Sequence, residues 1–254
     1  MQRIDLNSDL GEAFGPWTMG DDEAMLSIVT SANVACGGHA GDTETMWATC
    51  RTAAANGVVI GAHPGYADRE GFGRRIIPMH PDEIGRMVVA QIAALSGIAR
   101  LAGTEVRYVK LHGALANLAA ADEVVSAGIV RALQGAFPAL PVLAISGTRL
   151  EHVARDAGMQ VYSEIFADRT YQPDGQLVPR SQPGSVLHSA EEAAQRLIDF
   201  VEHGRMPVLG GDPIRLDAHS ICVHGDTPGA VGMARHIRER LVAAGLGLGP
   251  FLAA

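Results

Sequence analysis

Apolar and polar positions alternate along the chain in two recurring patterns. Short runs rich in β-branched residues, with apolar residues at every second position, have the period and length of strands. Longer stretches with the apolar spacing of amphipathic helices separate these runs, and the alternation repeats about seven times. The predicted strands are residues 3–7, 28–33, 58–63, 106–112, 142–146, 160–164 and 220–224.

The clearest helix is predicted at residues 80–101. Pro81, followed by two acidic residues, suits a first helical turn, and Ile84, Val88 and Ile92 lie on one apolar stripe. Further helices with clear start or stop signals are predicted at residues 122–137 and 189–204.

The repeated strand–helix order predicts a parallel sheet, because each helix returns the chain to the start of the next strand. Two architectures fit this order, a closed (β/α) barrel and an open doubly wound sheet. No linker or low-complexity tract is visible, so residues 1–254 are expected to form one domain. Residues 171–187 interrupt the rhythm and predict a loop insertion, a lid or hairpin over one end.

The two faces of the first strand differ in polarity. Side chains alternate along a strand, so Asp5, Asn7 and Asp9 share one face, opposite Ile4 and Leu6. An open sheet covered by helices on both sides should have two apolar faces. A barrel instead has helices outside and a binding site at the inner carboxyl ends of its strands. We therefore expect an α/β fold, a parallel (β/α) barrel of seven strands with a polar pocket.

Three later strands repeat this division between a polar and an apolar face. In each, the polar face becomes more polar toward the carboxyl end, and a glycine-containing turn follows, as in the βα-loops that carry the sites of such barrels. The residues that share these faces are Val59, Gly61 and His63; Tyr108, Lys110 and His112; and Cys222, His224 and Asp226.

Four of the ten histidines lie at or just beyond predicted strand ends. They could bind a divalent metal together with Asp9, or divide into metal ligands and acid–base catalysts. The alternative is that each is a hydrogen-bonded core residue, and no HExxH or other close ligand spacing points to a metal. The four are His39, His63, His112 and His224.

The acidic face of the first strand has two interpretations. Asp5, Asn7, Asp9 and Glu12 could bind a metal or supply a general base. Alternatively, Asp5 forms a buried salt bridge with Lys110, and Glu12 caps a turn. Lys110 could also hold a substrate carboxylate or polarise a carbonyl, and the two roles are compatible.

Five arginines fall in loops that are expected near the pocket. They could clamp a carboxylate or a phosphate, and the alternative for each is a solvated surface position. Arg75 is expected to be a bystander. The five are Arg69, Arg74, Arg75, Arg169 and Arg180.

Composition narrows the class of protein. A net charge of −8 and a pI near 5.6 argue against nucleic acid or an anionic membrane as the main partner. No apolar run is expected to reach the roughly 20 residues of a membrane helix, and no secretory signal is expected before the first strand. Cys36, Cys50 and Cys222 form no CxxC pair, which favours a reducing cytoplasm. Cys36 or Cys222 could be a nucleophile, although a buried structural thiol is the commoner role.

Seven ordered motifs extend over nearly the whole chain. They are "DLNSDLGE" (5–12), "SANVACGGHAGD" (31–42), "GAHPGYAD" (61–68), "GFGRR" (71–75), "VKLHGAL" (109–115), "EIFADRTY" (164–171) and "VHGDTPGAV" (223–231). On these motifs the chain resembles the LamB/YcsF family, which includes the A component of bacterial 5-oxoprolinase. The typical family motif KPHGALYN here reads "KLHGALAN". Leu111 replaces the proline and is expected to face the helices, and Ala116 replaces the tyrosine and is expected to widen the pocket.

The resemblance implies a barrel related to the glycoside hydrolase/deacetylase superfamily, in agreement with the strand faces. It implies a cytoplasmic hydrolase of a cyclic amide, for which 5-oxo-L-proline, ATP and water give L-glutamate, ADP and phosphate. It also implies ATP as a co-substrate, Mg²⁺ entering with the nucleotide, and the 5-oxoprolinase subunits B and C as partners; a homo-oligomer is compatible with it. Two alternatives stay open, a metal-dependent deacetylase-like hydrolase and a non-catalytic component that binds substrate or assembles the complex.

The expected site combines the motifs with the strand faces. The expected catalytic residues are Asp9, His39, His63, Lys110, His112 and His224. The expected substrate-binding residues are Asn7, Asn33, Asp42, Arg69, Glu164, Asp168, Arg169 and Asp226. If a metal binds, its expected ligands are Asp9, His39 and His63.

Overall fold

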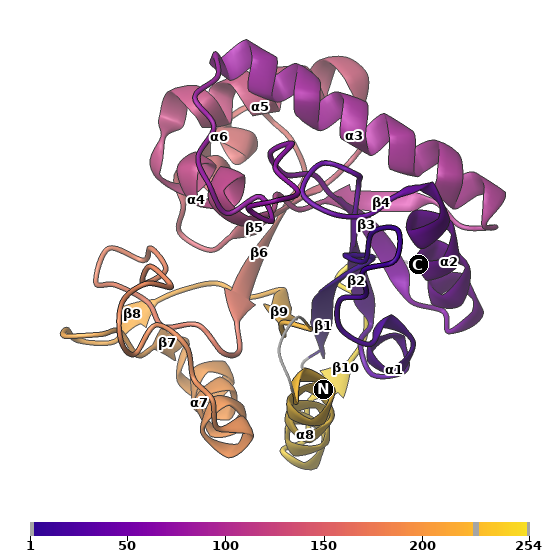
Figure 1. Ribbon diagram of the computed structural model, residues 1–254. Helices are drawn as coiled ribbons and strands as arrows, with labels where there is room; N and C mark the ends of the chain where they lie inside the picture. Colours follow the sequence, from indigo (N-terminus) through magenta and orange to yellow (C-terminus); the bar gives the residue numbers. More distant parts are fainter. Residues whose placement is uncertain (1–2, 226–228, 253–254) are drawn as a thin grey trace.

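Seven parallel strands form a closed barrel in the computed structural model, which describes residues 3–225 and 229–252 (Figure 1). The barrel strands are β1 (Arg3–Leu10), β2 (Ser31–Ala35), β3 (Val59–His63), β4 (Val106–Val109), β5 (Val142–Ile145), β6 (Val161–Phe166) and β9 (Ser220–Cys222). Each strand pairs with the next barrel strand along the chain, and β9 pairs with both β6 and β1. The predicted (β/α) barrel is thus confirmed, and the open sheet is excluded.

Predicted and observed strands overlap in all seven cases, and their ends differ for local reasons. The amide of Ile28 donates to the Met25 carbonyl (2.9 Å) in the turn after α1 (Asp22–Leu26), so β2 begins later than predicted. Lys110 lies beyond the end of β4, yet its amide still donates to the Ala62 carbonyl of β3 at 2.9 Å. The polar alternation of the fourth strand therefore continues past its regular end.

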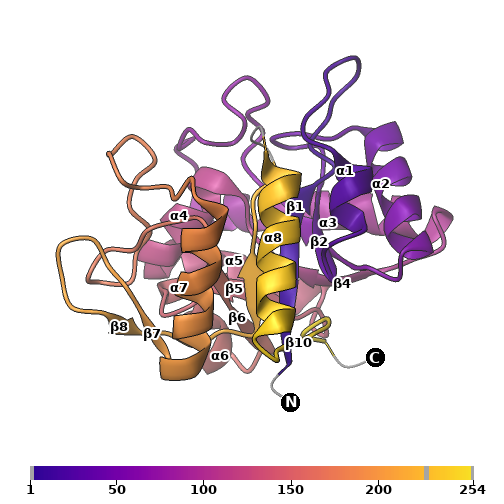
Figure 2. The same cartoon turned by 90° about the horizontal axis from the view of Figure 1, so that it is seen from below.

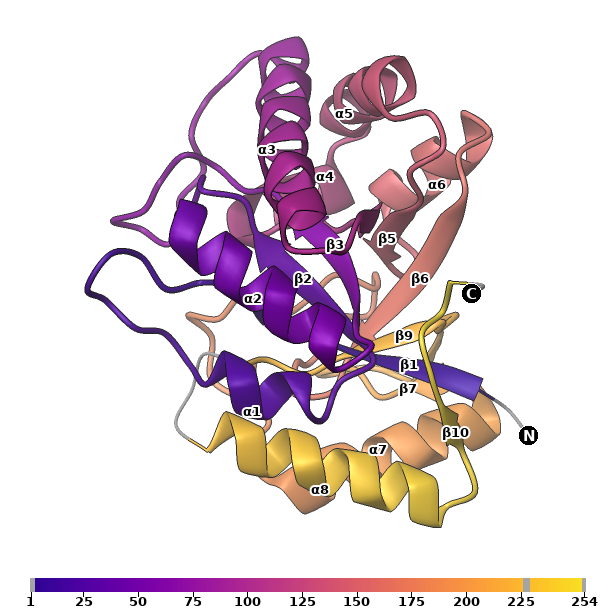
Figure 3. The same cartoon turned by 90° about the vertical axis from the view of Figure 1, so that its right-hand side faces the viewer.

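Helices surround the barrel (Figure 3). They are α1, α2 (Thr43–Ala55), α3 (Pro81–Leu101), α4 (Gly113–Ala121), α5 (Glu123–Ala136), α6 (Arg149–Asp156), α7 (Ala190–His203) and α8 (Ala230–Ala243). α2 and α3 pack against β3, α6 packs against β5 and β6, and α7 and α8 lie side by side (Figure 2). The helices leave the carboxyl ends of the strands to the βα-loops.

Side-chain caps set the ends of two predicted helices. At the start of α3, the Glu83 carboxylate accepts from the His80 amide at 3.0 Å, which forms half of a capping box. At the start of α7, the Ser189 hydroxyl accepts from the Glu192 amide at 3.2 Å. Gly204 ends α7 with φ of +65°, a left-handed conformation that glycine adopts without steric cost.

α3 is long and apolar enough to cross a membrane, by length and composition alone. It has 21 residues, and its most apolar window has a mean hydropathy of 1.4. The expectation that no run reaches this length is therefore wrong. Within the fold its stripe of Ile84, Val88, Ile92 and Leu95 is buried, and the helix packs on α2, α5 and the barrel. It is a covering helix of the barrel.

Polar side chains fill the barrel below its mouth, on the face that strand parity predicts. Asp5 accepts hydrogen bonds from Thr30 (2.5 Å), Ser31 (2.7 Å) and Ser220. Burial raises the pKa of Asp5 to about 6, although these hydroxyls oppose the rise. The predicted salt bridge between Asp5 and Lys110 is wrong, because the partners of Asp5 in the described chain are hydroxyls.

An aromatic ring enters the barrel only because glycine stands on the neighbouring strand. A Cβ atom at Gly61 would lie 2.3 Å from the ring of Tyr108, which is fully buried. The Tyr108 hydroxyl donates to Oδ1 of Asn33 at 2.6 Å. Glycine in β3 thus makes room for a large side chain from β4.

The predicted loop insertion, residues 171–187, folds back on itself beside the barrel mouth. Isolated bridges join Tyr171 to Leu177 and Arg169 to Val186. Its residues 177–181 line the cavity described below. Three short strands are not predicted by the sequence: β7 (Arg205–Met206), β8 (Ile214–Arg215) and β10 (Gly247–Leu248).

Candidate active site

A cavity of about 540 Å³ opens at the carboxyl ends of the barrel strands. Ionisable side chains from separate strands and loops line one part, and apolar side chains from α4, β5 and residues 177–179 line another. Barrels of this kind carry their sites at this end. The ionisable residues in the lining are Asp9, Glu12, His63, Arg74, Lys110, His112, Glu164, Arg169, Arg180 and His224.

Lys110 lies at the centre of this polar region. Its Nζ is 2.8 Å from Oε1 of Glu164, 3.0 Å from Oδ1 of Asp9, 3.1 Å from Sγ of Cys222 and 3.3 Å from Oδ1 of Asn7. Burial opposes a charge on Lys110, but Asp9, Cys222 and Glu164 together outweigh it and hold the pKa of Lys110 well above its usual value. Lys110 is therefore a permanent buried cation that fixes the surrounding acids.

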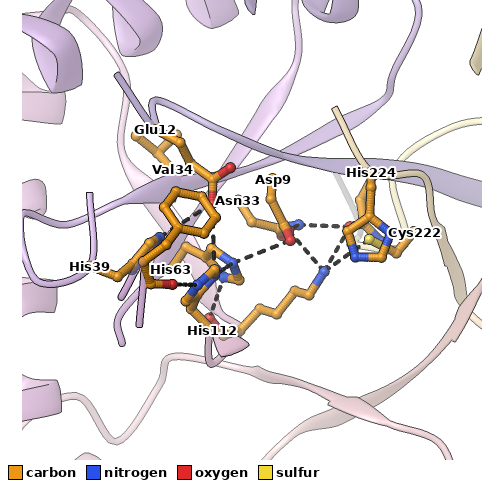
Figure 4. Close-up of polar contacts among 12 residues, drawn as sticks. Asp9, Glu12, Asn33, Val34, His39, His63, His112, Cys222 and His224 are labelled. Carbon is orange, nitrogen blue, oxygen red and sulfur yellow. Dashed lines mark hydrogen bonds and ion pairs between the residues drawn. The ribbon is translucent and has the colours of Figure 1, made fainter. Parts of the chain in front are cut away.

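Asp9 connects the two halves of the site (Figure 4). Its Oδ1 accepts from Lys110 and from Nδ2 of Asn33 (2.8 Å), and its Oδ2 lies 3.4 Å from Nε2 of His63. Burial alone would raise the pKa of Asp9, but the charges of His63 and Lys110 lower it well below its usual value. Asp9 is therefore ionised, and it is a weak base.

His224 and Asp168 form a pair on one side of Asp9. Nδ1 of His224 lies 2.8 and 2.9 Å from the two carboxylate oxygens of Asp168. Burial raises the pKa of Asp168, but the neighbouring His224, with a smaller effect from Arg180, lowers it by more. The pKa is therefore below its usual value, and the carboxylate is ionised. In the neutral ring, an ionised carboxylate accepts from Nδ1–H, and Nε2 then carries no proton. His224 can therefore act as a base at the cavity that it lines.

Two histidines face each other on the opposite side of Asp9. Nε2 of His63 lies 3.0 Å from Nδ1 of His112. The other ring nitrogen of each lies 2.9 Å from a backbone carbonyl: Nδ1 of His63 from that of Lys110, and Nε2 of His112 from that of Phe72. Burial, followed by the neighbouring His63, lowers the pKa of His112 to about 3.

His39 and Glu12 complete a cluster with these histidines. The ring of His39 stacks on that of His112 with centroids 3.5 Å apart, and its Nε2 lies 3.3 Å from Oε1 of Glu12. Burial and then the charge of His112 lower the pKa of His39 well below its usual value. One donor atom from each of Glu12, His39, His63 and His112 lies within 4.8 Å of the other three, so the cluster has the donor set of a metal site.

Two expected substrate-binding residues lie elsewhere. Asp42 caps α2, where it accepts from the amides of Thr45 (2.8 Å) and Gly15 (2.7 Å). Arg69 stacks over the ring of Phe14 at 3.9 Å and donates to carbonyls of the loop before α2. Among the residues that the structure describes, neither Asp42 nor Arg69 lines the cavity. The contacts of both are with loop backbone and neighbouring side chains. Asp226 lies outside the described residues.

The two expected asparagines lie one layer below the cavity. Asn33 donates from Nδ2 to Asn7 (2.7 Å) and to Asp9 (2.8 Å), and Asn7 donates to Glu164 (2.9 Å). Both are fully buried, and neither is among the described lining residues. They orient the two carboxylates that face Lys110, so they are positioning residues.

Arginines and apolar side chains form the rest of the cavity. Arg169 is buried and donates to the Val178 carbonyl at 2.6 Å, and burial lowers its pKa to about 10, which leaves it charged at neutral pH. Arg180 is exposed at the mouth. Leu111 lines the cavity, which corrects the expectation that it faces the helices, and Ala116 also lines it.

Two aromatic residues are among the cavity residues that the sequence did not predict, and one of them had a readable signal. Phe166 lies two residues after Glu164 on β6, so strand parity puts both on the inner face. Phe72 follows the glycine-rich turn after β3 and has φ of +53°, unusual for a residue with a side chain. The position of Phe166 can be predicted from strand parity in the sequence, whereas that of Phe72 depends on a backbone conformation that only the structure gives.

A family model described as the LamB/YcsF family matches residues 4–254. The chain belongs to the LamB/YcsF family. A relative from Pseudomonas syringae pv. tomato (strain ATCC BAA-871 / DC3000), named as one of the A components of 5-oxoprolinase, is 51% identical over 251 residues, which cover 99% of this chain and 98% of that protein.

Solved structures agree with this family. A lactam utilization protein from Thermus thermophilus has a TM-score of 0.91 and 40% identity, with 98% of this chain and 99% of that chain covered. A T48 deacetylase is similar in fold alone, with a TM-score of 0.51 and 11% identity. The match covers 98% of this chain and 88% of the deacetylase chain. This LamB/YcsF barrel is therefore deacetylase-like in architecture, as the family resemblance implied.

Proposed function

We propose that this chain is the hydrolytic A component of an ATP-dependent 5-oxoprolinase, which opens 5-oxo-L-proline to L-glutamate. The full-length similarity to proteins named as 5-oxoprolinase A components supports the activity. The observation that carries the proposal is the pair of His224 and Asp168 (2.8 Å) at a cavity whose floor is held by Lys110 and Asp9.

The reaction needs an activated carbonyl and a base. A lactam carbonyl is a poor electrophile, and transfer of a phosphoryl group from ATP to its oxygen activates the ring carbon. Water adds to that carbon and gives a proton to His224, the C–N bond breaks, and the ring nitrogen takes up the proton. The acyl phosphate that remains reacts with a second water to give L-glutamate and phosphate.

The cavity offers distinct groups for these steps. Asp168 holds the His224 ring by accepting from Nδ1, so that Nε2 receives the proton of the attacking water. Lys110 and Asp9 form a fixed polar floor of the cavity, which stabilises the charge that develops on the substrate in the transition state. Arg169 and Arg180 in the lining suit the substrate carboxylate, and both are among the loop arginines for which the sequence suggests this role.

The partners follow from the chemistry and from the relatives. The relatives are named as one lettered component of an enzyme, which supports a multi-subunit complex, and we assign its other components to the 5-oxoprolinase subunits B and C. ATP enters as the phosphoryl donor, with Mg²⁺ bound to the nucleotide. Three free, buried cysteines agree with a reducing cytoplasm.

The test is glutamate release from 5-oxo-L-proline and ATP by the purified chain, alone and with subunits B and C. Turnover only in the mixture is expected, and His224→Ala should abolish it while complex assembly is retained. The matched control is His236→Gln, which changes a surface histidine that pairs with Glu191. Full activity of His224→Ala would remove His224 from the mechanism, and ATP-independent hydrolysis of an acetylated amide would favour the deacetylase alternative.

A further inference from the structure

The proposed hydrolysis does not use the cluster of Glu12, His39, His63 and His112. Its members follow four consecutive strands: Glu12 after β1, His39 after β2, His63 at the end of β3 and His112 after β4. All four side chains are buried, with His39 and His63 each 1% exposed. Figure 4 shows the four side chains gathered on the side of Asp9 opposite His224.

The hydrogen bonds of His63 and His112 leave two nitrogens facing each other, neither of which has a proton to donate in a neutral ring. A carbonyl oxygen only accepts, so Nδ1 of His63 and Nε2 of His112 both carry protons toward the carbonyls that they contact. In neutral rings the remaining nitrogens, 3.0 Å apart, are then both acceptors. Two facing lone pairs need a cation between them, which is either a proton or a metal ion.

The distances fit a metal ion. Tetrahedral bonds of about 2.0–2.1 Å, as zinc forms with histidine and glutamate, place the ligand atoms about 3.3 Å apart. Here Nε2 of His63 and Nδ1 of His112 are 3.0 Å apart, Nε2 of His39 and Oε1 of Glu12 are 3.3 Å apart, and Nδ1 of His112 is 3.7 Å from Oε1 of Glu12. Three of the six distances between the four donors thus already match the edges of a tetrahedron, and all four donor atoms lie within 4.8 Å of one another. The parallel rings of His39 and His112 have to tilt for both to point at one ion.

The surroundings fit as well. Metal-bound histidines usually donate their other ring N–H to a carbonyl or carboxylate, as His63 and His112 do here. Glycines hold the stacked rings in place: a Cβ atom at Gly65 would lie 2.9 Å from Nδ1 of His39, and one at Gly73 would lie 2.7 Å from Cβ of His39. Any larger residue at these two positions would displace the ligands.

We propose that Glu12, His39, His63 and His112 form a tetrahedral zinc site that ties together the loops after β1, β2, β3 and β4. Four protein ligands fill a tetrahedral ion, which is the arrangement of structural zinc sites; catalytic sites keep one position for water or substrate. The ion therefore stabilises the wall of the cavity and leaves the hydrolytic step to His224. This set replaces the ligands expected from the sequence, since Glu12 and His112 take the place of Asp9.

Metal binding by the isolated chain tests this proposal without any activity measurement. After chelation and dialysis, the chain should take up one equivalent of Zn²⁺, and its midpoint of thermal unfolding should rise with the Zn²⁺ concentration. Substituted Co²⁺ should give the intense visible bands of a tetrahedral ion. No thiolate charge-transfer band is expected, because the cluster contains no cysteine.

Two variants and two controls make the test specific. His39→Ala and Glu12→Gln should weaken Zn²⁺ binding by more than about 100-fold, since loss of a group that only orients a ligand already costs roughly 10- to 100-fold. Cys222→Ala and His236→Gln should bind as the unchanged protein does. Circular dichroism checks that each variant is folded; if His39→Ala does not fold, Glu12→Gln decides.

Three results would overturn the site. They are binding of less than about one tenth of an equivalent, unchanged affinity in both folded cluster variants, and a thiolate band in the Co²⁺ protein. The last result would move the ion to Asp9, Cys222 and His224, whose donor atoms also lie within 4.8 Å of one another. Because the subunits B and C are not needed, failure of this test leaves the proposed hydrolysis unaffected.

Discussion

The ammonium of Lys110 lies 2.8 Å from the carboxylate of Glu164, and both groups are almost completely shielded from solvent. Lys110 directly follows β4 and Glu164 belongs to β6, and these strands are not neighbours in the barrel, since β5 lies between them. Together with Asp9, at 3.0 Å from Nζ, they form a buried charge network that crosses the barrel mouth. Removal of one partner leaves the others buried and uncompensated.

Lys110→Met should therefore lower the free energy of unfolding by about 3–5 kcal/mol, the cost of breaking a buried ion pair. Denaturant unfolding followed by circular dichroism measures the change. The double variant Lys110→Met/Glu164→Gln should recover part of the loss, because it removes one of the stranded carboxylates. Equal stability of the unchanged protein and Lys110→Met would show that the network contributes nothing to the fold.

Asp168→Asn tests how His224 is oriented. Asparagine keeps the shape but can donate to Nδ1, which stabilises the wrong ring tautomer, so kcat should fall by roughly 10³- to 10⁴-fold with a smaller change in KM. Glutamate release by the complete enzyme measures both constants. If kcat stays within a factor of a few while the variant is folded, Asp168 does not position the base.

The stability of the barrel should depend on pH through Asp5. Its pKa is raised from 3.8 to about 6 in the folded protein, so the folded state binds the proton more tightly than the unfolded state does. This proton linkage stabilises the fold fully below about pH 4, and the stabilisation is lost as the pH rises through about 6.

Asp5→Asn isolates that dependence. The difference in free energy of unfolding between the unchanged protein and the variant should fall by roughly 3 kcal/mol from about pH 3 to about pH 8, at about 1.36 kcal/mol for each unit of pKa shift. Unfolding titrations at several pH values measure it, and the subtraction removes the contribution of other groups. A difference that is constant with pH would mean that Asp5 titrates normally in the fold.

Gly61→Ala should destabilise the protein by about 1–3 kcal/mol, as overpacking of a core does. The new Cβ would lie 2.3 Å from the Tyr108 ring, which has no space to move in the barrel. Gly97→Ala is the matched control, because nothing lies within 4 Å of its Cβ position in α3 and alanine favours a helix by about 1 kcal/mol. The two substitutions should shift the unfolding midpoint in opposite directions, and a shared sign would contradict this packing.

The order of strands and helices, and the face on which the polar residues lie, could be predicted from the sequence. Strand parity is a local property, so Asp5, Asn7 and Asp9 share the inner face whatever the rest of the chain does. The same rule carried past the end of β4 puts Lys110 and His112 on the side of the site. Their chemical roles stay predictions, because shared orientation does not identify a reaction.

Contacts between these residues could not be predicted, because they depend on how distant strands meet. Lys110 pairs with Asp9 and Glu164 and not with Asp5, since the tilt and closure of the barrel decide which inner side chains share a layer. Asp42 and Arg69 lie in loops, where no period governs direction, and the structure turns both toward loop backbone. The facing nitrogens of His63 and His112 exist only once β3 and the loop after β4 are side by side. Local alternation thus determined which residues face inward, and only the closed barrel decided which of them touch.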